Sequence, residues 1–191
     1  MSLFIDAASA VDSRRVYVHL SQPRSAKPGS LEFRLNALPE FAIALDDPAR
    51  PAVRALLEAH LDDMRATSPP ESVHALDVEA LRGPGIDFWT LSIDGVLAGC
   101  SALRVLTGEH GEIKSMRTVA SQRGRGVAGA LVRHLLTEAR VRGIKRLSLE
   151  TGSQDFFASA RRLYARHGFE VCGPFGDYVL DPNSVFMTRA L

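Results

Sequence analysis

The stretch that decides the fold is Ser121–Arg142, SQRGRGVAGALVRHLLTEARVR. It begins with a polar, glycine-rich turn and continues with apolar residues spaced three and four apart, which predicts an amphipathic helix. Gly143 stands where that helix is expected to end. A glycine loop that opens a helix leaves several backbone N–H groups unpaired at the positive end of the helix dipole. With the charges of Arg123 and Arg125, these donors predict an anion site, and the expected anion is a phosphate or pyrophosphate.

Two well-known phosphate-binding motifs are not favoured for this stretch. A P-loop ends in Gly-Lys-Ser/Thr, whereas here valine follows Gly126. The spacing Gly124-x-Gly126-x-x-Gly129 fits the dinucleotide fingerprint, with Glu150 in the place of its ribose-binding acid. Residues 112–119, however, form a mixed polar segment rather than a buried parallel strand, and few residues follow Glu150. We therefore do not favour a nicotinamide nucleotide site.

Length and composition indicate one ordinary soluble domain with a short extension. The chain has 191 residues, 46% of them hydrophobic and 24% charged, and its net charge is +1, which gives no sign of a partner such as nucleic acid or an acidic membrane. No apolar run approaches the about 20 residues needed to span a bilayer, and the N-terminus lacks a signal-peptide pattern. Cys100 and Cys172 are isolated and no histidine pair has H-x-x-x-H spacing. We expect a cytoplasmic protein without a metal site.

The chain divides near residue 40. Residues 1–40 contain a flexible proline- and serine-rich stretch and form an N-terminal extension, in which residues 14–20 can form a short strand. Residues 41–191 form the main domain. Its expected strands are residues 41–45, 87–93, 96–106, 112–119, 145–150, 169–175 and 184–190. Its expected helices lie around residues 53–64, 72–82, 127–142 and 156–166.

The spacing Arg123-x-x-Gly126-x-Ala128 resembles the acyl-CoA pyrophosphate loop of the GNAT N-acetyltransferases, Gln/Arg-x-x-Gly-x-Gly/Ala. The strand before the loop, the helix after it and the later Leu163-Tyr164…Gly168-Phe169 follow in family order. Four longer motifs are similar to those of a bacterial subgroup without secure substrates: SPPES (68–72), GEIKSMR (111–117), LETG (149–152) and DPNSVFM (181–187). The resemblance implies an α/β (α+β) GNAT fold over residues 41–191. Its mixed, mostly antiparallel sheet has about six to seven strands, splays in the middle and is flanked by about four helices.

The resemblance also implies a reaction, namely acetyl transfer from acetyl-CoA to a primary amine. We expect direct attack in a ternary complex, because no cysteine lies in the matched motifs. Coenzyme A contacts are expected from the strand before the loop and from the loop itself: Met116, Arg117, Thr118, Arg123, Gly124, Arg125, Gly126, Val127, Ala128 and Gly129.

Two residues are the predicted catalytic groups. Tyr164 matches the tyrosine that faces the sulfur in many GNAT enzymes, and a phenol with a pKa of about 10 is a proton donor at neutral pH. Glu112, eleven residues before Arg123, matches the strand glutamate that acts as general base in the histone-acetylating branch. Glu150 is the alternative candidate for the general base. A base that acts through a water molecule would have no recognisable motif in the sequence. At the position where many members carry a pantetheine-contacting asparagine, this sequence has Phe157.

The acceptor is expected to be a small-molecule amine. Its contacts are expected from the region after the first helix and from the later strand and loop: Glu71, Ser72, His74, Glu150 and Tyr178. Two alternatives remain open, acetylation of protein lysines or N-termini, and a non-catalytic module that senses acyl-CoA. A homodimer is compatible with the family, although the sequence contains no recognisable interface.

Overall fold

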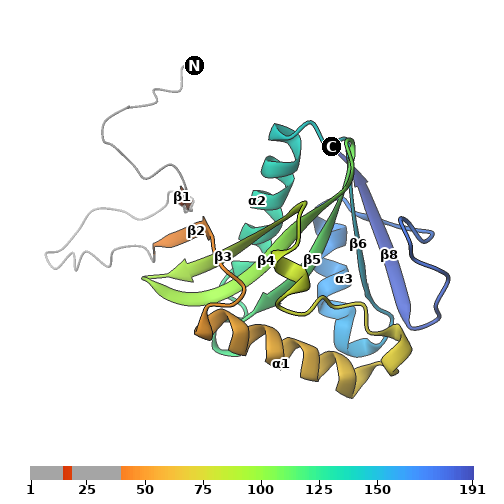
Figure 1. Cartoon of the computed structure of the whole chain (residues 1–191), viewed down its shortest axis with the longest axis horizontal. Helices are drawn as coiled ribbons and strands as arrows, with labels where there is room; N and C mark the ends of the chain where they lie inside the picture. Colours follow the sequence, from red (N-terminus) through yellow and green to blue (C-terminus); the bar gives the residue numbers. More distant parts are fainter. Residues whose placement is uncertain (1–14, 19–39) are drawn as a thin grey trace, which may run out of the picture.

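A single mixed sheet runs through the protein, and the computed structural model describes the chain over residues 15–18 and 40–191. Its strands are β1 (Arg15–Val18), β2 (Phe41–Leu45), β3 (Ile86–Ile93), β4 (Val96–Thr107), β5 (His110–Thr118), β6 (Arg146–Gly152), β7 (Glu170–Cys172) and β8 (Ser184–Ala190). They lie in the order β1-β2-β3-β4-β5-β6-β8-β7 (Figure 1). Neighbours pair antiparallel except β5 and β6, which are parallel because the chain crosses over between them.

The predicted mixed, mostly antiparallel sheet is confirmed, with eight strands instead of about six to seven. The additional strand is β1, which lies in the predicted N-terminal extension, where a short strand over residues 14–20 is expected, and pairs with β2 of the main domain. The rest of that extension, up to residue 39, lies outside the described residues.

Three α-helices pack on the sheet in the described part of the chain, one fewer than the about four expected. They are α1 (Pro51–Thr67), α2 (Val127–Val141) and α3 (Ala158–Arg166), joined by the short 3-10 helices η1 (Pro70–Ser72), η2 (Ala80–Arg82), η3 (Ala120–Gln122) and η4 (Asp155–Phe157). Figure 1 shows α1 on one face of the sheet and α2 and α3 on the other. None of the helices described is long and apolar enough to cross a membrane.

The prediction of a helix over residues 72–82 is wrong, because this segment contains only the last residue of η1, Ser72, and the short helix η2. Val78 and Leu81 of this segment are buried in the core on the α1 face. The carbonyl oxygen of His74 accepts a hydrogen bond from the Lys114 side chain of β5 instead of a helical partner. The segment therefore stays mostly irregular and lies against the sheet.

Two apolar clusters hold the helices to the sheet. The larger cluster lies under α2, whose predicted stripe is buried and includes Leu131 and Leu135 with no exposed surface. Burying one leucine side chain contributes about 1.5–3 kcal/mol, so this stripe fixes α2 and the glycine loop that precedes it. The smaller cluster lies under α1 and contains Val53, Leu57 and Phe88.

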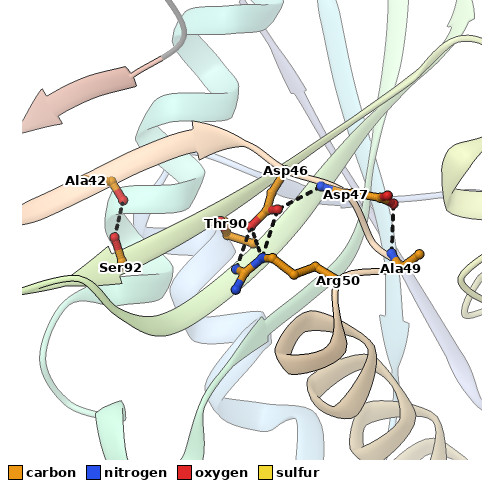
Figure 2. A network of polar contacts seen from close by, with 7 residues as sticks. All are labelled: Ala42, Asp46, Asp47, Ala49, Arg50, Thr90 and Ser92. Carbon is orange, nitrogen blue, oxygen red and sulfur yellow. Dashed lines mark hydrogen bonds and ion pairs between the residues drawn. The ribbon is translucent and has the colours of Figure 1, made fainter. Parts of the chain in front are cut away.

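A carboxylate fixes the junction between β2 and α1 (Figure 2). Asp46 accepts hydrogen bonds from Arg50 Nη2 at 2.6 Å and from Thr90 Oγ1 at 2.8 Å, and Thr90 belongs to β3. Asp47 accepts a further bond from the backbone N–H of Ala49 at 2.9 Å, just before the helix begins. These contacts set the direction of α1, which runs across the sheet towards β5.

The sheet splays between β5 and β6, as the family resemblance implies. Their pairing starts at His110 and Arg146 and ends at Ile113 and Leu149, although both strands continue. On its other side β5 bulges against β4, where a register shift adds one residue and Ser115 takes a φ of 50°. The diverging ends of β5 and β6 leave room for a site between them.

A long loop covers the sheet on the α1 face beside this split. It joins β7 to β8, and its Phe175 and Tyr178 rings lie 5.1 Å apart, centroid to centroid. Both rings also contact the ring of Phe186 on β8. The loop therefore places an aromatic cluster against β8, from which the Tyr178 hydroxyl reaches Glu112 of β5.

Candidate active site

The glycine loop borders a large cavity of about 570 Å³, which lies between the end of β5, the start of α2 and one side of α3. Gly124 and Gly126 have φ values of 77° and 83°, a conformation that only glycine adopts without strain. No side chain caps α2, and within the described residues the backbone N–H groups of Val127, Ala128 and Gly129 have no acceptor. The loop thus presents free donors to this cavity, at the positive end of the α2 dipole.

The residues predicted to hold coenzyme A gather here with one exception. Those lining the large cavity are Met116, Arg117, Thr118, Arg123, Gly124, Gly126, Val127, Ala128 and Gly129. Arg125 does not line it, and its guanidinium instead donates to Gln122 Oε1 at 2.6 Å. Arg166 of α3 adds a positive charge to the cavity wall that sequence reasoning did not anticipate.

A small cavity of about 100 Å³ adjoins the large one and shares Met116, Ala160 and Tyr164 with it. Its other walls come from α1, the segment after α1, the bulge of β5 and the end of β6. Of the residues predicted to contact the acceptor, Ser72, His74 and Glu150 line it. Glu71 is exposed and lines neither cavity. Tyr178 also stays outside the lining, and its ring packs edge-on against His74 at a centroid distance of 5.1 Å.

Tyr164 stands where the two cavities meet. Its side chain is 7% exposed, and its hydroxyl donates to the sulfur of Met116 at 3.5 Å. Burial, assisted by the nearby Glu150 charge, raises the pKa of Tyr164 well above its ordinary value of 10. The phenol therefore keeps its proton throughout the neutral range.

Glu150 follows the last residue of β6 that pairs with β5, so the split in the sheet exposes it to the small cavity. Its Oε1 accepts a hydrogen bond from Ser184 Oγ at 2.8 Å. Burial raises the pKa of Glu150 above its ordinary value of 4.5, and this effect exceeds the lowering by the Ser184 bond and the His74 and Lys114 charges. A carboxylate with a raised pKa is a better proton acceptor than an ordinary one.

Glu112 is fully buried and lines neither cavity. Its Oε1 accepts a hydrogen bond from the Tyr178 hydroxyl at 2.6 Å and lies 3.4 Å from Lys114 Nζ. Its Oε2 lies 3.7 Å from an Arg104 nitrogen. Burial and the Glu112 charge together raise the pKa of Tyr178, so the tyrosine remains a donor to this carboxylate. Glu112 thus holds the covering loop and Lys114 in place.

Among the residues of the small cavity that the sequence did not predict, three carry titratable or unpaired polar groups. Lys114 is only 7% exposed, and its ammonium donates to the His74 carbonyl at 2.9 Å and to Tyr178 Oη at 2.7 Å. Ser115 is 9% exposed, and its Oγ has no partner within the described residues. His60 of α1 is kept neutral, because burial and the Arg117 charge lower its pKa to about 4. The signal available for Lys114 was the alternation Glu-x-Lys within a strand expected at the centre of the sheet.

The thiols take no part in either cavity. Cys100 is fully buried, and burial raises its pKa to about 12, so it is inert as a nucleophile at neutral pH. Cys172 lies on β7 and lines neither cavity. Among the described residues no group of three or more side chains is placed to bind a metal ion.

Residues 53–169 match the family described as the acetyltransferase (GNAT) family. An uncharacterized N-acetyltransferase of Bacillus subtilis (strain 168), YsnE, is 53% identical over 149 residues, which cover 78% of this chain and 99% of the relative. An IAA acetyltransferase of Azospirillum brasilense is 37% identical over 158 residues, which cover 81% of this chain and 100% of the relative.

A solved structure from Klebsiella pneumoniae, described as a candidate acyl-CoA N-acyltransferase, superposes with a TM-score of 0.65 at 28% identity and covers 79% of this chain and 97% of its own. A Bacillus subtilis acetyltransferase solved in complex with CoA shares the fold with a TM-score of 0.58 at 18% identity, covering 78% of this chain and 97% of its own.

Proposed function

Because the chain belongs to the GNAT acetyltransferase family, we propose that this enzyme transfers the acetyl group of acetyl-CoA to the primary amine of a small molecule while both are bound. The observation that carries the proposal is the pair of adjoining cavities that meet at Tyr164. One cavity has the features of an acyl-CoA site, and the other has the features of a site for a small amine.

The large cavity fits acetyl-CoA, the cofactor of this enzyme. The unpartnered N–H groups at the start of α2 and the charge of Arg123 match a diphosphate, and the glycines of the loop leave space above the backbone. The diverging end of β5 extends the cavity from there towards Tyr164. When bound, acetyl-CoA supplies the acetyl group as a thioester, whose C–S bond breaks as the C–N bond to the acceptor forms.

We propose Glu150, rather than Glu112, as the group that takes the proton of the attacking amine. Glu150 lines the small cavity and its pKa is raised by burial, whereas Glu112 is enclosed beneath Tyr178 and Lys114. Tyr164 holds a proton at its hydroxyl between the two cavities, where it is available to the departing sulfur. Direct attack is supported by the two cysteines, which lie outside both cavities.

The size of the small cavity supports a small acceptor. Its volume of about 100 Å³ lies well below the about 300–1,000 Å³ of pockets that hold drug-sized ligands. Its walls come from α1, the following segment, β5, β6 and α3.

A panel of amine acceptors tests the proposal, with acetyl-CoA as donor and the release of free thiol as the readout. It should include small amines, a lysine-containing peptide and a peptide with a free N-terminus. We expect turnover with small amines and little with either peptide. Binding of coenzyme A without turnover on any acceptor would instead support a sensor, and a thermal shift with NAD but not with coenzyme A would contradict the assignment of the large cavity.

A further inference from the structure

The small cavity carries opposite charges on neighbouring strands. Lys114 and Glu150 are the residues that follow the last paired positions of β5 and β6, and both line the cavity. They form no ion pair with each other among the described residues, since Glu150 is bound by Ser184 and Lys114 by the His74 carbonyl and Tyr178. The cavity therefore has a cationic wall and an anionic wall, both formed by the fold before any ligand binds.

Lys114, the cation of this wall, shares its carboxylate partner with a second cation. The single carboxylate of Glu112 faces two cations, Lys114 at 3.4 Å and Arg104 at 3.7 Å. Tyr178 adds no negative charge, because burial and the Glu112 charge raise its pKa. Two of the three ammonium hydrogens of Lys114 are used by the His74 carbonyl and Tyr178, and Glu112 makes an ion-pair contact without a hydrogen bond. One donor of Lys114 is left over, and Lys114 shares the Glu112 carboxylate with Arg104, whose side chain is 40% exposed and lies outside the cavity lining.

A second donor lies beside Lys114. The bulge of β5 places Ser115, with its φ of 50°, in the lining of the same cavity. Its hydroxyl is buried and has no partner within the described residues, which is uncommon for a buried polar atom and indicates a ligand contact. An ammonium and a hydroxyl side by side suit a carboxylate, which accepts several charge-assisted hydrogen bonds.

We propose that the acceptor is a small amino acid, whose carboxylate is bound by Lys114 and Ser115 and whose amine faces Glu150. The inference rests on the proposed function and narrows its substrate class. A zwitterion matches both walls of the cavity, whereas a simple amine would leave the remaining Lys114 donor and the Ser115 hydroxyl without an acceptor. The cavity volume of about 100 Å³ restricts the acceptor to a small member of this class.

The wild-type enzyme provides the first test, because it needs no variant that could fail to fold. Glycine, alanine and serine are each compared with the matching carboxamide and with the matching amine that lacks the carboxylate, and kcat/KM is measured by thiol release. The amine of a carboxamide is less basic than that of the acid, so a larger share of it is unprotonated at neutral pH and able to attack. A higher kcat/KM for the acid therefore reflects binding of the carboxylate. We expect kcat/KM to be at least about tenfold higher for the acid than for its carboxamide. This is the effect of losing one charge-assisted hydrogen bond.

The outcomes separate the two proposals. Turnover of carboxamides or simple amines as fast as of the acids would overturn the zwitterion inference and leave the acetyltransferase proposal standing. The absence of thiol release with any amine or peptide would overturn the proposed function, and this inference with it.

Lys114→Met tests the assignment of the carboxylate site, with Lys145→Met as the matched control because the Lys145 side chain is 72% exposed and pairs with Glu109. We expect kcat/KM for the acids to fall about 10- to 100-fold in Lys114→Met, while the acid-to-amide ratio falls to about one. If Lys114 had only a structural role, kcat/KM would fall equally for the acids and the amides and their ratio would stay unchanged. That result would overturn the assignment. Glu112→Gln/Lys114→Met removes both buried charges and allows the same ratio to be measured if the single variant does not fold.

Discussion

The two cavities meet at one tyrosine but are built in different ways. The large cavity takes its donors from the backbone of one continuous stretch, residues 122–129, and their direction is set by the start of α2. The small cavity is formed by side chains of α1, the following segment, β5 and β6, which lie far apart in the sequence. A site built from consecutive backbone groups leaves a short motif in the sequence, whereas a site built from distant side chains does not. If the two cavities act independently, a substitution in one should leave ligand binding in the other unchanged.

The largest effect is expected from Glu150→Gln, on the side of the small cavity. Removing a general base lowers kcat/KM by about 100- to 10,000-fold, and we expect the affinity for coenzyme A to stay within about twofold. Steady-state kinetics and a coenzyme A titration measure the two quantities. Glu109→Gln, at an exposed turn residue, is the control. If Glu112→Gln lost activity while Glu150→Gln kept it, the base would be the residue that the sequence favoured.

Tyr164→Phe tests the position where the cavities meet. It removes the proton next to Met116 and keeps the ring, so we expect kcat to fall about 100-fold with little change in coenzyme A affinity. Single-turnover measurements of thiol release report the step directly. A fall in coenzyme A affinity that accounts for the whole loss would mean that Tyr164 belongs to the large cavity alone.

A smaller effect is expected from two arginines of the glycine loop. Arg123 lines the large cavity and Arg125 does not, so Arg123→Gln should raise the Kd for coenzyme A about tenfold and Arg125→Gln less than about twofold. Isothermal titration at low and moderate salt measures both, and the Arg123 effect should shrink as salt screens it. Equal effects of the two substitutions would show that only the overall charge of the loop matters.

The smallest effect is a displacement in the pH profile. The active form needs ionised Glu150, and burial raises the pKa of this group above 4.5, so kcat/KM should rise with pH through a limb above that value. Tyr164 has a raised pKa and stays protonated on the basic side, so it should produce no loss of activity near pH 10. The profile should be measured with several acceptors whose amines differ in pKa. A limb that belongs to the enzyme stays at the same pH, whereas a limb that belongs to the acceptor moves with the pKa of its amine. The acid limb should disappear in Glu150→Gln, and its persistence there would assign it to another group.

The sequence was most informative where neighbours in the chain are also neighbours in space. The glycine loop, the helix after it and the split between β5 and β6 follow from local spacing and the family motif, and the structure has them all. The helix expected over residues 72–82 failed because Val78 and Leu81 pack against the sheet, a tertiary contact that overrides local propensity. Lys114 could not be assigned for the same kind of reason, since its partners His74 and Tyr178 lie 40 and 64 residues away.

The role of Glu112 likewise depends on contacts with residues that are distant in the sequence. Its place on β5 is correct, and its distance from the loop matches the family pattern. What the sequence could not supply is the loop between β7 and β8, which brings Tyr178 over the carboxylate and closes it off. The surroundings of a strand residue depend on which segments fold over it, and so does its role.

One strand, β5, forms a wall of both cavities, and its bulge sets which residues face each of them. Ser68, Ser72 and His74 belong to the small cavity alone. Divergence of acceptor choice among homologues should therefore concentrate in the segment after α1, where exchanges leave the acyl-CoA site untouched. A chimaera that carries this segment from a relative would inherit that relative's selectivity while keeping its own affinity for coenzyme A.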